Sequence, residues 1–348
     1  MKQYLQLSSN KILDILKIIP GNFILPSVQI FPSNLCNFDC VMCSSGKSKI
    51  EDIEVMDFSL MEKIIIECSK FIFKPLLHFS GYGEPLLYPR IKETMELCDE
   101  RKNKWSMTTN AYMLEKYVED VVSNNCYAIN ISIHGNAAQH DKITGIKGSF
   151  DKVIKSILKL EEVKQQYNKI TPYIALNCVI TNINVTHLKD ILKLLQSLPV
   201  SSITFQHLHF SINNLRMENE SGMHLQTIDK ANLHELNEFL TYLEHANLPI
   251  KTFTYPKIKR KDIIGYYSDP FYKFNNSCIY PWLSVEIYPN GNVQLCNQVI
   301  GNLETDSLKS IIKSKKANEF KNWVKQEKTD PFSQSPDCFR CMHQRYYK

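Results

Sequence analysis

The sequence carries Cys36-Asn37-Phe38-Asp39-Cys40-Val41-Met42-Cys43, which places three cysteines at the spacing C-x₃-C-x₂-C. An apolar run typical of a β-strand, Ser27–Pro32, comes just before it. Iron–sulfur cubes usually have four cysteine ligands, so three thiolates leave one iron without a protein ligand. An open coordination position distinguishes a reactive metal site from a closed structural one. The stretch therefore predicts a reactive iron–sulfur centre, with a zinc loop or three incidental core cysteines as the alternatives.

Downstream of this stretch, strand-like apolar runs alternate with amphipathic helical patterns. Strands are expected at 27–32, 76–80, 105–109, 127–133, 173–180 and 203–208, and helices near 60–68, 91–98, 114–122, 153–158 and 188–195. Ser59-Leu60-Met61-Glu62 reads as a capping box at the start of the first of these helices. Strands that alternate with helices predict an α/β fold, a parallel sheet with right-handed crossovers.

Composition narrows the class of protein. The formal charge of +5 on 348 residues is weak and no dense basic run is present, which argues against a nucleic-acid partner. The 11 cysteines are odd in number and partly grouped in close sets, which favours metal ligation in a reducing compartment, the cytoplasm. Ile12–Ile19 predicts a short amphipathic helix, and no stretch approaches the roughly 18 apolar residues of a membrane span.

Gly81-Tyr82-Gly83-Glu84-Pro85 follows the second expected strand. Glycines there let the backbone approach a ligand closely, although a tight turn alone would also use them. Together with Cys36, Cys40 and Cys43, this segment resembles the signature of the radical S-adenosylmethionine (radical SAM) enzymes. The resemblance implies a partial (β/α)₆ TIM-like barrel and a [4Fe–4S] cluster that these three cysteines and S-adenosylmethionine ligate. It further implies one-electron cleavage of that cofactor to a 5′-deoxyadenosyl radical, which abstracts a substrate hydrogen.

The resemblance also assigns residues to S-adenosylmethionine. They are Met42, Gly81, Tyr82, Gly83, Glu84, Asn110, Ser132, Val179 and Ile180. The glycine segment is expected along the methionine part and its ammonium group, and Val179 and Ile180 on the adenine. Asn110 belongs to a T-N-G-like segment in which Ala111 replaces the glycine. Met42 replaces a common aromatic residue, and its polarizable thioether still suits packing against adenine.

Three histidines are the candidate catalytic residues. His134 stands where the family often has Asp, and it is either a titratable active-site imidazole or a hydrogen-bonded turn residue. His207 and His209 flank one residue at the end of the sixth expected strand, so both side chains face the same side. They are candidates for substrate contact or proton transfer, with structural roles as the alternative.

Four more cysteines lie near the C-terminus, at positions 278, 296, 338 and 341. A hairpin with its turn at Asn290-Gly291 is expected to bring Cys278 and Cys296 together, and helices from 307 to 328 lead back to the C-x₂-C pair. A zinc ribbon is the alternative, although ribbons normally use two short knuckles. The segment resembles the SPASM/twitch extension of radical SAM enzymes, which implies one auxiliary [4Fe–4S] cluster bound by these four cysteines.

We therefore expect an N-terminal extension at 1–26, a radical SAM barrel at 27–250 and a SPASM/twitch-like domain at 251–348. The resemblance implies an oxidoreductase, for example one that dehydrogenates an alcohol of a small polar or sugar-like substrate while the auxiliary cluster accepts an electron. An electron donor such as flavodoxin or ferredoxin would then be a partner. The alternative is a peptide-modifying enzyme, and a more remote one is a non-catalytic metal-binding or electron-transfer protein.

Overall fold

One ten-stranded sheet organises the chain, in the order β10-β9-β8-β1-β2-β3-β4-β5-β6-β7. The computed structural model describes residues 25–43, 52–208, 227–269, 272, 280–296 and 298–326. The parallel strands in chain order are β1 (Ser27–Ile30), β2 (Leu76–Phe79), β3 (Trp105–Thr109), β4 (Ala128–Ser132), β5 (Tyr173–Ile180), β6 (Ser202–His207) and β7 (Lys251–Tyr255). The fold class expected from the sequence is confirmed, with β7 as a further parallel strand that pairs with β6.

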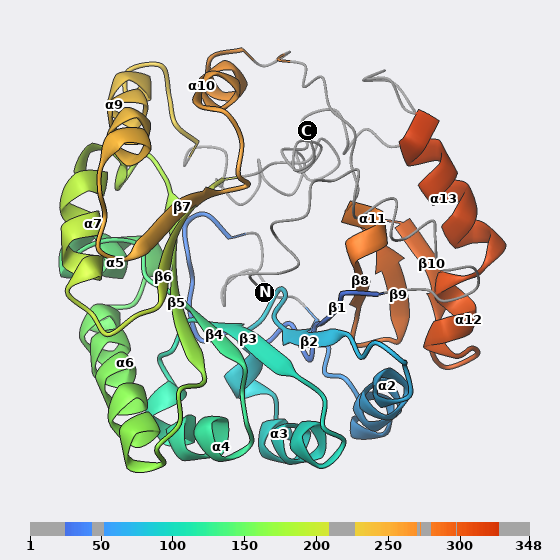
Figure 1. Cartoon of the computed structure of the whole chain (residues 1–348). Helices are drawn as coiled ribbons and strands as arrows, with labels where there is room; N and C mark the ends of the chain where they lie inside the picture. The colour runs from blue at the N-terminus through green and yellow to red at the C-terminus, as the bar shows by residue number, and fades with distance from the viewer. Residues whose placement is uncertain are drawn as a thin grey trace.

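Helices cover the outer face of the curved sheet (Figure 1). They are α2 (Phe58–Ser69), α3 (Ile91–Glu100), α4 (Val118–Ser123), α5 (Ala137–Thr144), α6 (Ser149–Gln166), α7 (Leu188–Gln196), α9 (Leu233–His245) and α10 (Arg260–Ser268), with 3₁₀ turns η2 (Pro85–Leu87), η3 (Leu114–Tyr117) and η4 (Val185–His187). Helix α2 begins differently from the expectation. Its N-cap is Asp57, whose carboxylate accepts a hydrogen bond from the Ser59 amide at 2.7 Å, so the predicted capping box at Ser59 is wrong.

The two faces of the sheet differ in chemistry. Alternate residues such as Val28 and Ile30 on β1, or Leu176 and Cys178 on β5, point outward and are fully buried against the helices. The residues between them, such as Gln29 and Asn177, point to the inner, concave face and keep part of their surface accessible. The outer face is thus the hydrophobic core, and the inner face is a mostly polar surface.

The C-terminal segment joins the same sheet. Strand β8 (Ser284–Ile287) pairs in parallel with β1, and the predicted hairpin is confirmed as the antiparallel pair of β8 and β9 (Asn292–Leu295). The turn needs Gly291, whose φ is +78°. Strand β10 (Gln298–Asn302) and helices α11 (Tyr280–Leu283), α12 (Leu308–Ile312) and α13 (Lys315–Gln326) complete this part (Figure 1).

The domain boundaries stay predictions. The expected boundary at 250 falls directly before β7, which continues the sheet, and the N-terminal helix expected at 12–19 lies outside the described residues. Within the part of the chain that the structure covers, no helix is both long enough and apolar enough to cross a bilayer.

Candidate active site

The three-cysteine loop lies at the C-terminal end of β1, where barrels of this kind carry their chemistry. Cys36, Cys40 and Cys43 are partly exposed, and none of them forms a disulfide within the described residues. The Sγ atom of Cys36 accepts the Phe38 amide at 3.5 Å, and the Cys43 amide donates to the Cys40 carbonyl at 3.0 Å. Backbone amides of the loop thus point at the Cys36 sulfur, which suits a thiolate ligand.

The three cysteines do not form a site for a single metal ion, and a cube does not require one. Among the described residues, no three His, Cys, Asp or Glu side chains converge as ligands of one metal ion. The thiolates of a cube each bind a different iron, so they need not meet at one point as in a zinc site. Burial raises the pKa of Cys36 to about 11, so a metal that binds this sulfur must displace its proton.

Helix α5 holds the cysteine loop from one side. The Asp39 amide donates to the Thr144 carbonyl at 3.1 Å, and the Val41 amide donates to the Ile143 carbonyl at 2.9 Å. Met42 is buried against Ile143 in a small apolar cluster that Val179 also joins. Met42 and Val179 therefore lie together beside the cysteines, as expected for two residues that would flank one ligand.

The glycine segment after β2 packs closely against the residues that lead into the cysteine loop. A Cβ atom at Gly83 would lie 2.5 Å from the carbonyl oxygens of Ser33 and Leu35, which lead into the cysteine loop. Gly81 has a φ of +120°, and a Cβ there would lie 2.6 Å from the ring of Phe31. Both glycines are thus required by the close passage of the chain over itself, whatever else they contact.

Glu84 braces three loops at once. Its carboxylate accepts hydrogen bonds from the Thr109 hydroxyl at 2.6 Å, the Asn110 amide at 2.7 Å and the Leu86 amide at 3.1 Å. Its own amide donates to the Leu35 carbonyl at 2.7 Å. Burial raises the pKa of Glu84 to about 6, against these hydrogen bonds, which lower it. These three bonds use most, but not all, of the roughly four acceptor positions of a carboxylate. Glu84 is therefore a positioning residue in this structure, and a bond from it to a ligand ammonium group stays a prediction.

Asn110 continues this bracing. Its side-chain amide donates to the Asn37 side-chain carbonyl at 2.7 Å and so ties the end of β3 to the cysteine loop. Ser132 ends β4 on the inner face, in register with Asn177 of β5. The cysteine loop, the glycine segment, Asn110 and Ser132 therefore lie at the C-terminal ends of β1 to β4.

His134 is a buried residue whose hydrogen bonds hold neighbouring segments of the chain together. It is 3% exposed, its Nδ1 accepts the Val179 amide at 3.2 Å, and its carbonyl accepts the side-chain amide of Asn184 at 2.9 Å. Its ring stacks on His140. Burial lowers the pKa of His134 to about 3, so the ring is neutral. The hydrogen-bonded turn is the interpretation that fits, and an acid–base role for His134 does not.

Replacing His134 by alanine should therefore lower the free energy of unfolding by about 2–4 kcal/mol, because a buried amide loses its acceptor and a cavity is left. Urea unfolding followed by circular dichroism measures this. The exposed His187, whose side chain caps nothing, is the matched control, and His187→Ala should cost less than about 0.5 kcal/mol. Equal losses in both variants would contradict the assignment.

His207 points away from the inner face. It is 1% exposed on the outer side of β6, together with Ile203 and Phe205, and its Nδ1 lies 3.4 Å from the Tyr267 hydroxyl of α10. The structural alternative therefore fits His207 and a substrate contact does not, because alternation along a strand shows which residues share a face but not which face is the inner one. Gln206 is the residue that faces inward. His209 lies outside the described residues.

Val179 and Ile180 are neighbours on β5 and so face opposite sides. Val179 lies beside Met42, whereas Ile180 is fully buried in the outer core. The expectation that both pack on adenine is therefore wrong for Ile180.

The inner face carries polar residues that sequence reasoning did not single out. His78 on β2 contacts the hydroxyls of Ser106 at 2.8 Å and Thr108 at 3.0 Å, and the Asn177 amide donates to Gln206 at 2.8 Å. Along their strands, these polar residues alternate with buried apolar residues. This alternation is the sequence signal from which an inward-facing position could have been inferred.

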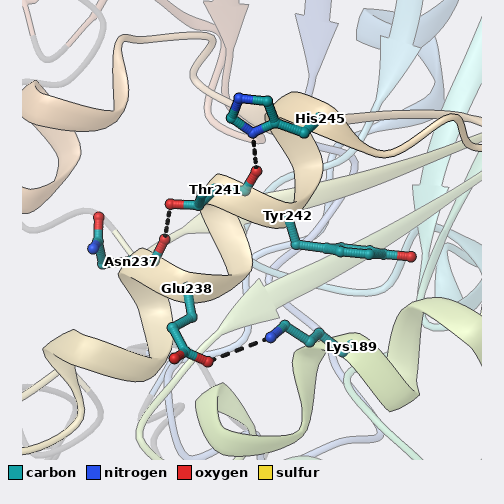
Figure 2. A pocket seen from close by; sticks show the side chains of 6 residues that line it. All are labelled: Lys189, Asn237, Glu238, Thr241, Tyr242 and His245. Atoms are coloured by element: carbon teal, nitrogen blue, oxygen red, sulfur yellow. Dashed lines mark hydrogen bonds and ion pairs between the residues drawn. The ribbon is translucent and has the colours of Figure 1, made fainter.

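A separate surface pocket lies in the outer helix layer, between α7 and α9. Residues such as Lys189 and Glu238 line it (Figure 2).

Of the four C-terminal cysteines, only Cys296 is among the described residues. It follows β9, is partly exposed and has a φ of +53°. Cys278, Cys338 and Cys341 lie outside the described ranges.

Comparison with known families gives two matches. The family described as the radical SAM superfamily matches residues 30–195. The SPASM family, an iron–sulfur cluster-binding domain, matches residues 278–342, a range that includes all four C-terminal cysteines.

Curated relatives match the barrel region. A probable GTP 3′,8-cyclase of Methanococcus maripaludis is 30% identical over 150 residues, 42% of this chain and 49% of that protein. The Fe-coproporphyrin III synthase of Methanosarcina barkeri is 24% identical over 186 residues, 53% of this chain and 44% of that protein. The chain thus spans about half the length of these relatives.

Solved structures share the fold over most of the chain. SuiB of Streptococcus suis bound to S-adenosylmethionine superposes with a TM-score of 0.64 and 19% identity, covering 90% of this chain and 72% of SuiB. The enzyme anSMEcpe with bound AdoMet gives 0.62 and 17%, covering 92% and 94%. The cofactors of these families are a [4Fe–4S] cluster with S-adenosylmethionine and auxiliary iron–sulfur centres. With a barrel match that begins on β1, a second match over its last cysteines and this shared fold, the chain belongs to the radical SAM superfamily and carries a C-terminal SPASM iron–sulfur domain.

Proposed function

We propose that this protein is a radical SAM oxidoreductase that removes a hydrogen atom from a polar substrate, for example in the dehydrogenation of an alcohol. The observation that carries the proposal is the position of the cysteine loop. It is braced by Glu84 and Asn110 at the mouth of a barrel whose inner face is polar, with Gln29, Asn177 and Gln206 turned inward. A polar inner face suits a hydroxyl-bearing substrate, because buried polar groups need hydrogen-bond partners.

In this proposal Cys36, Cys40 and Cys43 hold the cluster, which together with S-adenosylmethionine supplies a 5′-deoxyadenosyl radical. The chain's own residues bind and orient. The hydrogen bond between Asn110 and Asn37 fixes the loop, and Met42 and Val179 form an apolar wall for an adenine ring.

The proposal also assigns roles to Ser132 on the inner face and to the four C-terminal cysteines. Ser132 offers a hydroxyl on the inner face. The cysteines at 278, 296, 338 and 341 would hold one auxiliary cluster, fully ligated by protein and therefore suited to accepting an electron rather than binding substrate. A flavodoxin- or ferredoxin-type donor would supply the reducing electron.

Peptide modification is the second candidate. It is favoured by the similarity of SuiB bound to its precursor peptide SuiA, which superposes over 96% of this chain at 18% identity. An identity this low supports the fold but does not fix the substrate. The two candidates predict the same cofactor cleavage and differ in whether the oxidised group belongs to a peptide.

The test of both is anaerobic reconstitution with iron and sulfide, followed by incubation with S-adenosylmethionine and dithionite. We expect 5′-deoxyadenosine and methionine to form. A protein that keeps its cluster and makes neither would instead be a non-catalytic metal-binding or electron-transfer protein. If dithionite supports cleavage, replacing it with a reduced flavodoxin or ferredoxin then tests the proposed donor.

A further inference from the structure

A carboxyl group that the proposed mechanism does not use lies on the inner face of the barrel. Glu286 on β8 is in register with Gln29 on β1, and both side chains point inward. The Tyr288 hydroxyl donates to Glu286 Oε2 at 3.2 Å, and the Tyr280 hydroxyl also hydrogen-bonds to this carboxylate. Tyr280 in turn accepts from the Gln29 side-chain amide at 2.6 Å. The carboxylate is therefore held in a fixed direction by neutral donors.

This carboxylate has no countercharge in the described part of the chain. None of the ion pairs there includes Glu286, and no cation contributes to its electrostatic surroundings. Burial raises the pKa of Glu286 to about 7, which is the expected response of a carboxyl group removed from water without a cation beside it. A buried charge of this kind is normally paired with a cation or neutralised by a proton.

Glu286 is close to the cofactor end of the barrel. The Tyr288 ring lies 4.9 Å from Phe31 and 6.2 Å from Tyr82, measured between ring centroids. Tyr82 belongs to the glycine segment after β2, so contacts between aromatic rings connect the surroundings of Glu286 to the proposed cofactor site. Glu286 lies on the inner face and keeps part of its surface accessible, although its carboxyl group is largely shielded from water.

We propose that Glu286 is a substrate-binding residue that pairs with a cationic group, an ammonium or guanidinium, of the molecule to be oxidised. The proposal rests on the proposed function, because it places the substrate inside the barrel. Such a cation is carried by an amine-bearing small molecule or by the lysine or arginine side chain of a peptide. In either case the charge–charge hydrogen bond would fix which carbon faces the radical.

The test measures binding rather than turnover. Reconstituted protein with S-adenosylmethionine but no reductant is titrated by calorimetry with cyclohexylamine and with cyclohexanol, which have similar size but different charge. We expect the amine to bind at least about tenfold more tightly, since a hydrogen bond to a buried charge is worth about that factor or more. The same comparison for a peptide substrate uses N-acetyl-lysine amide and N-acetyl-norleucine amide. Whichever of the two amines, cyclohexylamine or N-acetyl-lysine amide, binds more tightly indicates whether the cation belongs to a small molecule or to a peptide.

Glu286→Gln should abolish this preference while leaving cyclohexanol binding unchanged. Glu238→Gln is the matched control, because Glu238 lies in the outer pocket paired with Lys189 at 3.4 Å, and it should keep the preference (Figure 2). Binding of the amine to the wild type should strengthen as the pH rises through about 7, where Glu286 ionises. Tyr280 and Tyr288, which contact Glu286, stay protonated there, because burial raises the pKa of each. Tyr255 and Cys296 lie near Tyr280, and Tyr82 lies beside Tyr288.

The proposal is overturned if the wild type shows no preference for the amine or if Glu286→Gln retains it. Should that variant fail to fold, the pH profile of the wild type decides, since a flat profile overturns the pairing and a rise through about 7 supports it. None of these readings depends on cofactor cleavage, so a failure of the proposed function would be seen separately.

Discussion

Replacing Cys36, Cys40 and Cys43 together by alanine should lower the iron content from about eight to about four atoms per chain and abolish 5′-deoxyadenosine formation. The reason is that the three thiolates are the only protein ligands proposed for the cluster that binds S-adenosylmethionine. Iron and sulfide assays after anaerobic reconstitution, with product quantified by chromatography, measure both effects. The loss of cleavage should be complete, because no other group in the proposed site supplies an electron to the cofactor.

Two controls make this result specific. Cys68 and Cys178 are fully buried in the outer core, where burial raises the pKa of each thiol far above its usual range, so alanine there should leave the iron count unchanged. Cys296→Ala should instead remove the other four irons and preserve the cleavage of S-adenosylmethionine. Retention of about eight irons in the triple variant, or zinc in place of iron at the C-terminal cysteines, would contradict the ligand assignment.

The sequence was sufficient for features that depend on local pattern. Strands β3 and β5 have the predicted limits, and the turn at Gly291 is where its positive φ requires a glycine. The three-cysteine loop and the glycine segment are also local patterns, and a parallel sheet is enough to predict that they meet at one end of the barrel.

Features that depend on orientation could not be predicted in the same way. Alternation shows that His207 and Ile203 share a face, but only the packing of α10 shows that this face is the outer one. The sequence alone does not distinguish Glu286, because a single acidic residue in a predicted hairpin is typical of a solvent-facing position. Its importance comes from the pairing of β8 with β1, a contact between segments far apart in the sequence.

The structure also assigns Gly83 a demanding steric role. A Cβ atom there would lie 2.5 Å from two backbone carbonyl oxygens, those of Ser33 and Leu35. Backbone atoms cannot rotate out of the way as a flexible side chain can. Gly83→Ala must therefore move the start of the cysteine loop, the glycine segment, or both.

We expect Gly83→Ala to lower the free energy of unfolding by about 3 kcal/mol, at the upper end of the cost of overpacking a closely packed site. Because the displaced segment leads directly to Cys36, the variant should also lose most of its S-adenosylmethionine-binding cluster and retain about four irons. Urea unfolding of the cluster-free chain separates the steric cost from the loss of metal.

Gly148→Ala is the control that isolates the steric effect. Gly148 has a φ of +76° but no atom within 4 Å of an added Cβ, so alanine there should cost only the backbone strain of about 1–2 kcal/mol and leave the iron content unchanged. If Gly83→Ala behaves like Gly148→Ala, the loop adapts to the extra methyl group. The close passage of the two segments would then be a consequence of the fold, and holding the cluster would not depend on it.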